Sequence, residues 1–192
     1  MNSPISKEPL INYGPIEGIV LLGGGALLRK ICLWANSSDY PIKVVTAQRH
    51  ADEVIDHQTL SEFLDHQRIE QLIVNNIADS SVKEFIGNPT NLFCLSLGAA
   101  WIFNESIISS HFDNKLFNLH GTRLPQNRGG GGFSWQIMMG NRLGFCVLHH
   151  VDGGIDSGDI VAFDEFIFPP TARKPIDYMN IQIEKNLNFI IN

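Results

Sequence analysis

The sequence predicts an α/β fold in which helices flank a mostly parallel sheet. Short apolar runs of strand length alternate with segments whose apolar residues recur at helical spacing, and the first such pair lies at 18–23 and 26–35. The 192 residues are 44% hydrophobic and 18% charged, which is ordinary for a globular protein with a sizeable core. Because alternating strands and helices build parallel sheets covered by helices, we expect one domain over residues 1–192.

The remaining elements follow in chain order from the same patterns. Gly23-Gly24-Gly25 indicates a tight turn between the first strand and the first helix. Further strands are expected at 42–47, 71–74, 91–97, 116–120 and 144–151, and helices at 59–67, 105–110 and 134–139, with a loop at 123–133. Two short strands, 160–163 and 165–168, are expected to pair with each other.

The last segment, 175–192, has a helical pattern, and Pro175 suits its first turn. This helix lacks a C-terminal cap, so we expect either a chain that continues beyond Asn192 or a frayed natural end.

Charge and cysteine content restrict the class of function. Fourteen basic residues against 20 acidic ones give a formal net charge of -6, which argues against nucleic acid as a partner while leaving a local basic patch open. No apolar run reaches membrane-spanning length, and residues 1–8 lack the apolar centre of a signal peptide. Cys32, Cys94 and Cys146 form no CxxC pair and each lies in an apolar run. Buried thiols of this kind predict a reducing, cytoplasmic location.

Asn118 and His120 are the first candidate functional pair. They end an apolar run and lie two positions apart, so on a strand their side chains point to the same face. Asp156, in the later segment 151–159, is the candidate carboxylate that reaches His120. Such a contact orients the imidazole and favours its protonated form, as a general acid/base requires. Polar residues that merely satisfy hydrogen bonds at a strand end are the structural alternative.

These residues resemble the formyltetrahydrofolate-dependent formyltransferases, most of all those that act on nucleotide sugars. The resemblance rests on Asn118-Leu-His120, Leu124-Pro125, Arg128-Gly129 and the run 154–159, and it is strongest over residues 92–160. It implies a Rossmann-like catalytic domain with a mostly parallel sheet flanked by helices. Gly121 stands where many members have proline, and Gly130-Gly131-Gly132 is richer in glycine than usual. These departures concern the identity of the acceptor more than the chemistry.

The resemblance also implies the roles of the site residues. Asn118 and His120 would donate hydrogen bonds to the developing oxyanion, and Asp156 would orient His120 and accept a proton. The residues implied for binding the cosubstrate 10-formyltetrahydrofolate are Leu97, Gly98, Ala99, Ala100, Trp101, Ile102, Asp152, Gly153, Gly154 and Ile155. Those implied for the acceptor are Gly121, Thr122, Arg123, Leu124, Arg128 and Gly129.

The expected acceptor is a small-molecule primary amine, by preference an amino sugar carried on a nucleotide. A purine-precursor ribotide and methionyl-tRNA are the alternative acceptors within the family. We expect neither a nucleic-acid nor a membrane partner, and the chain could assemble as a homodimer.

Other interpretations compete with formyl transfer. The same residues could pass the formyl group to water, as in a hydrolase. A nucleotide-binding module would instead use the turn Gly23-Gly24-Gly25 as its main site, although that turn lacks GxGxxG spacing. His149 and His150 could join His120 as metal ligands, but adjacent strand residues face opposite sides, so at most one of the two shares a site with His120 and no metal is expected.

Overall fold

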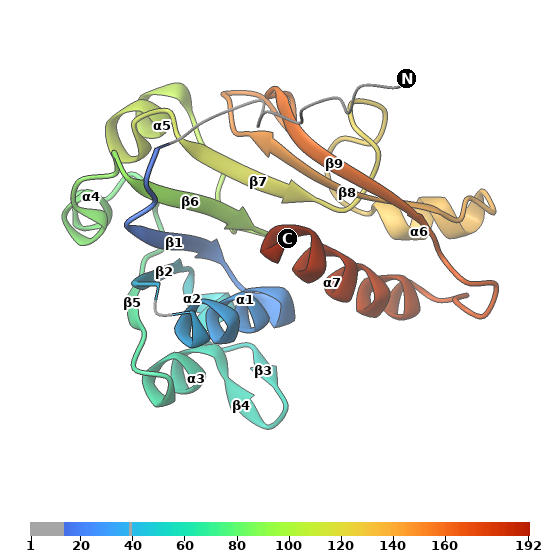
Figure 1. The fold of residues 1–192 in the computed structure, drawn as a ribbon, viewed down its shortest axis with the longest axis horizontal. Helices are drawn as coiled ribbons and strands as arrows, with labels where there is room; N and C mark the ends of the chain where they lie inside the picture. Colours follow the sequence, from blue (N-terminus) through green and yellow to red (C-terminus); the bar gives the residue numbers. More distant parts are fainter. Residues whose placement is uncertain (1–13, 39) are drawn as a thin grey trace, which may run out of the picture.

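The computed structural model describes residues 14–38 and 40–192, and its centre is a seven-stranded sheet (Figure 1). The strands of this sheet, in spatial order, are β5 (Glu70–Ile73), β2 (Ile42–Thr46), β1 (Gly18–Gly23), β6 (Leu92–Leu97), β7 (Leu116–His120), β8 (Leu143–His150) and β9 (Ile160–Ile167). The helices are α1 (Gly25–Ser37), α2 (Gln48–Ala51), α3 (Leu60–His66), α4 (Ser80–Ile86), α5 (Glu105–Phe112), α6 (Gly132–Met138) and α7 (Pro175–Ile191). Residues 1–8, where the sequence shows no apolar centre of a signal peptide, lie outside the described residues.

The direction of the strands reverses at β8 and again at β9. Strands β5, β2, β1, β6 and β7 are parallel, whereas β8 runs antiparallel to β7 and β9 runs antiparallel to β8. The predicted mostly parallel α/β sheet with flanking helices is therefore confirmed.

Helices cover both faces of the sheet. Leu21 belongs to the apolar layer beneath α1, α3 and α7, whereas its neighbours Val20 and Leu22 belong to the layer beneath α4 and α5. Helix α7 lies beside α1, and Lys30 and Glu184 form an ion pair between them at 3.0 Å (Figure 1). Alternating strand residues thus supply two separate cores, as expected where helices pack on both faces.

Strand β7 places its polar residues on the side of α4 and α5. Phe117 and Leu119 pack in the layer under α1 and α7, and Leu116 packs in the opposite layer. Asn118 and His120 have the same parity as Leu116 and so share its face. They follow Leu116 toward the carboxyl end of the strand.

The expected pair of short strands after residue 159 is wrong. Ile160–Ile167 is one continuous strand, β9, and it pairs with β8 rather than folding on itself. Asp164 stands opposite Cys146 inside this ladder. The strand continues through Asp164 because this side chain is exposed on an edge strand, where a polar residue interrupts neither the backbone hydrogen bonds nor the alternation of side chains.

Three short elements were not predicted. The hairpin of β3 (Val54–Ile55) and β4 (Gln58–Thr59) projects from the body of the fold (Figure 1), and α2 and α4 are the other two. The start of helix α4 could be recognised from the sequence, since Asp79 is a typical N-cap residue whose side chain accepts a hydrogen bond from the amide of Ser81.

The glycine turn after β1 is confirmed and has a steric cause. Gly23 has φ of +126°, and a Cβ there would collide with the carbonyl oxygen of Leu97 at the end of β6. The three cysteines are buried free thiols, and burial raises the pKa of each to about 12. In the part of the chain that the structure covers, no helix combines the length and apolarity needed to cross a membrane.

Candidate active site

A cavity of about 360 Å³ opens at the carboxyl ends of β6 and β7. Ligands of open α/β sheets collect at this edge, because the loops that follow parallel strands meet there. The cavity is lined by Ser96, Gly98, Ala99, Trp101, Ile102, Phe103, Asn118, Leu119, His120, Gly129, Gly130, His149, Val151, Asp152, Gly154, Ile155 and Asp156. All three predicted catalytic residues are among them.

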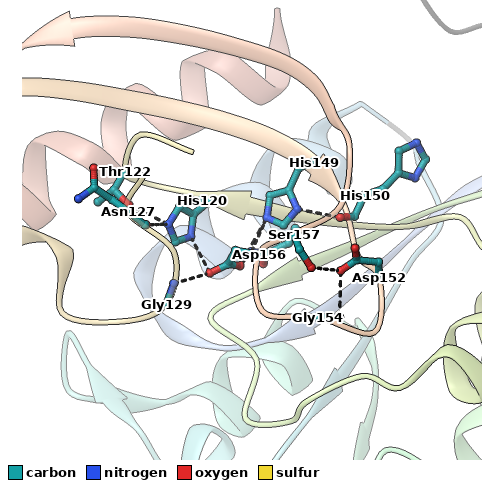
Figure 2. A network of polar contacts seen from close by, with 11 residues as sticks. His120, Thr122, Asn127, Gly129, His149, His150, Asp152, Gly154, Asp156 and Ser157 are labelled. Carbon is teal, nitrogen blue, oxygen red and sulfur yellow. Dashed lines mark hydrogen bonds and ion pairs between the residues drawn. The ribbon is translucent and has the colours of Figure 1, made fainter. Parts of the chain in front are cut away.

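Asp156 reaches the site from the loop that follows β8. Its Oδ2 lies 3.5 Å from Nδ1 of His120, and the two side chains are 16% and 13% exposed. The amide of Gly129 donates a hydrogen bond of 2.9 Å to the same oxygen. Figure 2 shows His120, Asp156 and His149 pointing toward one another. Residues more than 25 positions apart in sequence therefore hold one carboxylate beside the imidazole.

The loop that carries Asp156 is itself fixed by hydrogen bonds. Oδ1 of Asp152 accepts from the hydroxyl of Ser157 at 2.7 Å and from the amide of Gly154 at 3.1 Å (Figure 2). The Ser157 hydrogen bond is the main reason that the pKa of Asp152 lies below its usual value. At Gly158 a Cβ would collide with the carbonyl oxygen of His150, so the loop returns to β9 against the backbone of β8.

The other ring nitrogen of His120 faces the loop after β7. Nε2 lies 2.7 Å from Oγ1 of Thr122 and 2.9 Å from the carbonyl oxygen of Asn127. The Thr122 hydroxyl donates to that same carbonyl oxygen at 2.8 Å. Both nitrogens of His120 thus have acceptor atoms as neighbours.

His149 is a member of the site whose role the sequence analysis missed. Its side chain is 2% exposed, and its Nδ1 lies 2.7 Å from the carbonyl oxygen of His150. A carbonyl oxygen only accepts, so Nδ1 carries the hydrogen and Nε2 accepts one from Nδ2 of Asn118 at 3.1 Å. Burial is the main cause that lowers the pKa of His149 from its ordinary value, and the nearby His120 lowers it further. The carbonyl of His150 and the carboxylates of Asp156 and Asp152 act in the opposite direction and raise it. The hydrogen bond to the carbonyl of His150 thus places a hydrogen on Nδ1, and burial disfavours a second one on Nε2.

Asn118 links His149 to Asp156. Its Nδ2 also donates to Oδ1 of Asp156 at 3.2 Å, which fixes the amide with its nitrogen toward these two side chains. Alternation along the strand allowed at most one histidine of the pair 149–150 to share a site with His120, and His149 is that one. The ring of His150 lies 4.7 Å from that of Phe117 on the opposite face. Strands β7 and β8 pair antiparallel, which places Asn118 directly opposite His149. The sequence analysis did not predict this pairing, so it did not bring His149 to Asn118.

The remaining predicted binding residues lie in several places. Gly98, Ala99, Trp101, Ile102, Asp152, Gly154 and Ile155 line the cavity, whereas Leu97, Ala100 and Gly153 lie outside its lining. Of the residues implied for the acceptor, Gly129 lines the cavity and Arg128 is exposed next to it.

The segment just after His120 lies away from the cavity lining. Leu124 is buried with Phe145 and Val147, and the Arg123 guanidinium lies 6.0 Å above the ring of Phe145, beside a second hollow. A Cβ on Gly121 would lie 3.3 Å from the side chain of Gln182 in α7, and Thr122 is 5% exposed behind His120. Among residues 14–38 and 40–192, no three His, Cys, Asp or Glu side chains are arranged to hold a metal ion.

Comparison with known proteins was made on sequence and on structure. No family model matches the chain. A methionyl-tRNA formyltransferase from Finegoldia magna is 25% identical over 97 residues, which is 50% of this chain and 31% of that protein. A structure of WlaRD, a sugar 3N-formyltransferase in the presence of dTDP and 5-N-formyl-THF, superposes with a TM-score of 0.71 at 21% identity and covers 93% of this chain and 61% of the other.

A glycinamide ribonucleotide transformylase from Symbiobacterium toebii superposes with a TM-score of 0.70 at 17% identity, over 92% of this chain and 84% of that one. The chain thus spans about a third of the curated relative and less than two thirds of the sugar enzyme. The curated relatives and the solved structures both point to the formyltransferase family, and this chain has the α/β fold of those formyltransferases.

Proposed function

We propose that this protein transfers the formyl group of 10-formyltetrahydrofolate to a primary amine, with Asn118, His120 and Asp156 as its catalytic residues. The observation that supports this most directly is the position of Asp156. Its two carboxylate oxygens lie 3.5 Å from the imidazole of His120 and 3.2 Å from the amide of Asn118, at the wall of one cavity.

The cavity suits a folate in its size and chemistry. Trp101, Ile102 and Ile155 give it an apolar part that fits a flat heterocycle, and the polar groups of β7 and of the Asp156 loop lie at its other side. The resemblance of the sequence assigns the cosubstrate to this same region, between residues 97–102 and 152–155.

Formyl transfer exchanges one carbon–nitrogen bond for another. The acceptor nitrogen forms a bond to the formyl carbon, and the bond from that carbon to the folate nitrogen breaks. One proton leaves the acceptor nitrogen and one reaches the folate nitrogen, so no net proton is consumed. His120 and Asp156 are the groups placed to move this proton, because the imidazole and the carboxylate face each other at the cavity.

Negative charge develops on the formyl oxygen during this exchange, and hydrogen-bond donors must stabilise it. Protonated His120 supplies one donor at Nδ1. Asn118 supplies another by exchanging its hydrogen bond to His149 or to Asp156 for one to the formyl oxygen. Loss of one such donor typically costs about 100- to 1000-fold in rate.

We propose a nucleotide-linked amino sugar as the acceptor. Two considerations support it: the sequence resembles nucleotide-sugar enzymes, which favours it over a ribotide, and the formal charge of -6 disfavours a nucleic acid such as tRNA. Arg128 is exposed and directly precedes Gly129 of the cavity lining in the sequence, and its guanidinium is a cationic group that suits a charged acceptor.

The test is to incubate the protein with 10-formyltetrahydrofolate and a panel of amines, and to identify formylated products by mass spectrometry. The panel holds nucleotide-linked amino sugars, a glycinamide ribotide and methionyl-tRNA. We expect a formylated nucleotide sugar and tetrahydrofolate in equal amounts.

Each other outcome overturns part of the proposal. Formylation of the ribotide or the tRNA alone refutes the acceptor. Formate release that does not change with added amine indicates a hydrolase. Ligand binding and function that survive His120→Asn indicate a nucleotide-binding module.

A further inference from the structure

We propose that Thr122 is a positioning residue, which holds His120 so that the proton enters and leaves at Nδ1, beside Asp156. The inference rests on the proposed function, since it concerns the proton transfer of that reaction. It differs from a substrate-binding role for Thr122, because this side chain is 5% exposed and lies behind His120 rather than in the cavity lining.

The hydrogen bonds around Nε2 of His120 determine which nitrogen carries the hydrogen. The carbonyl oxygen of Asn127 lies 2.9 Å from Nε2, and a carbonyl oxygen has no hydrogen to donate. The Thr122 hydroxyl gives its single hydrogen to the same oxygen at 2.8 Å, so its lone pairs face Nε2 at 2.7 Å. Nε2 meets two acceptors and must itself carry a hydrogen.

The consequence concerns the opposite nitrogen. A neutral imidazole carries one hydrogen, so with Nε2 protonated the lone pair belongs to Nδ1. Nδ1 lies 3.5 Å from Oδ2 of Asp156, and Gly129 donates to that same oxygen at 2.9 Å. One loop, residues 122–129, therefore fixes the ring of His120 at one end and the carboxylate of Asp156 at the other.

The side chain of Thr122 suits this task by its shape. Its methyl group packs so closely on Gly132, at the start of α6, that a Cβ on that glycine would collide with it. A β-branched residue packed on one side has a restricted χ1 angle, and the direction of its hydroxyl is restricted with it. Thr122 thus stabilises both the Asn127 carbonyl and the hydrogen on Nε2.

The experiment measures the tautomer of His120 directly, by ¹⁵N NMR of the ring nitrogens at a pH where the imidazole is neutral. We expect the wild-type protein to show hydrogen on Nε2. Loss of one hydrogen bond in Thr122→Val should lower the preference for this tautomer about fivefold, and Thr122→Ser, which keeps the hydroxyl, should restore it. If Thr122→Val does not fold, Thr122→Ala provides the same comparison.

Thr46→Val is the matched control, because Thr46 is also buried and its hydroxyl also donates to a backbone carbonyl, that of Gly23, at 2.7 Å. It should lower stability comparably and leave the His120 signals unchanged. In the transfer assay, Thr122→Val should reduce kcat and leave the KM for the formyl donor unchanged.

An unchanged tautomer ratio in Thr122→Val, or a Thr122→Ser protein that behaves like the valine variant, would overturn the inference. A wild-type protein without transferase activity, whose ring signals still respond to Thr122→Val, would refute the proposed function and leave the positioning contact intact.

Discussion

Asn118 and His149 stand opposite each other where β7 and β8 pair, and the amide of Asn118 donates to Nε2 of His149 across 3.1 Å. Nδ1 of His149 donates a hydrogen bond to the carbonyl oxygen of His150, so Nε2 is the acceptor nitrogen of this ring. The direction of the Asn118 amide is thereby fixed as well. The same amide donates a hydrogen bond to Asp156, so a buried histidine aligns two of the three proposed catalytic residues.

Replacement of His149 should therefore impair catalysis without removing a reacting group. We expect His149→Phe to lower kcat for formyl transfer about 10- to 100-fold, since Asn118 loses the acceptor that orients it and small misplacements at a reacting centre have effects of that size. The measurement is steady-state kinetics. His111→Phe, at a buried histidine of α5, serves as the control and should leave kcat unchanged. Equal rates for wild type and His149→Phe would contradict this role.

His120 and Asp156 should be needed for catalysis but not for folding. His120→Asn and Asp156→Asn should each reduce kcat about 100- to 1000-fold, because each removes a group that acts on the developing charge or the proton. Thermal unfolding followed by circular dichroism should show that both variants stay folded. Retention of more than a tenth of wild-type activity by either variant would be inconsistent with the proposed chemistry.

Stability should fall in mild acid. Burial is the largest factor that lowers the pKa of both His149 and His111 from the ordinary value of 6.5. Below that value the unfolded chain binds protons that the folded chain does not, so the free energy of unfolding decreases as the pH falls toward the folded pKa values. Each group contributes at most about 1.4 kcal/mol per pH unit.

Urea denaturation at pH 7 and pH 5 checks this prediction. The loss of stability between the two pH values should be smaller in His149→Phe and in His111→Phe than in the wild-type protein. A wild-type protein as stable at pH 5 as at pH 7 would show that these rings are not kept neutral by burial.

The backbone at Gly158 should control the position of Asp156. Gly158→Ala places a Cβ against the carbonyl oxygen of His150, which cannot move without distorting β8, so the loop must shift. We expect a lower melting temperature and a kcat reduced about 100-fold, because Asp156 lies two residues away in the same loop. Full activity in this variant would mean that the loop adapts without moving the carboxylate.

The packing of α7 against the end of β9 depends on Phe168. This side chain is 0% exposed and stacks on Tyr178 with ring centroids 3.8 Å apart. Phe168→Ala should lower the free energy of unfolding by about 3 to 5 kcal/mol, as urea titration would measure. Phe163→Ala, at a ring that is 63% exposed, should change it by less than about 0.5 kcal/mol. Similar losses in the two variants would contradict this account.

Much of the fold was readable from local pattern. Runs such as 18–23 and 91–97 are apolar because parallel strands are covered on both faces, and α7 shows helical spacing because one side packs on the sheet. β9 was divided wrongly, because Asp164 resembles a break in the sequence while on an exposed edge strand it faces solvent. The hairpin at 54–59 was missed because its strands are two residues long and hold no apolar alternation.

The sequence by itself determined that Asn118 and His120 share one face of a strand, because strand side chains alternate, and the family resemblance of the run 154–159 singled out Asp156. Only the tertiary structure decided that Asp156 reaches both of them and that His149 lies opposite Asn118. Local periodicity sets which way a side chain points. Contacts between residues 20 to 40 positions apart depend instead on strand order, strand direction and loop closure, which no local pattern encodes.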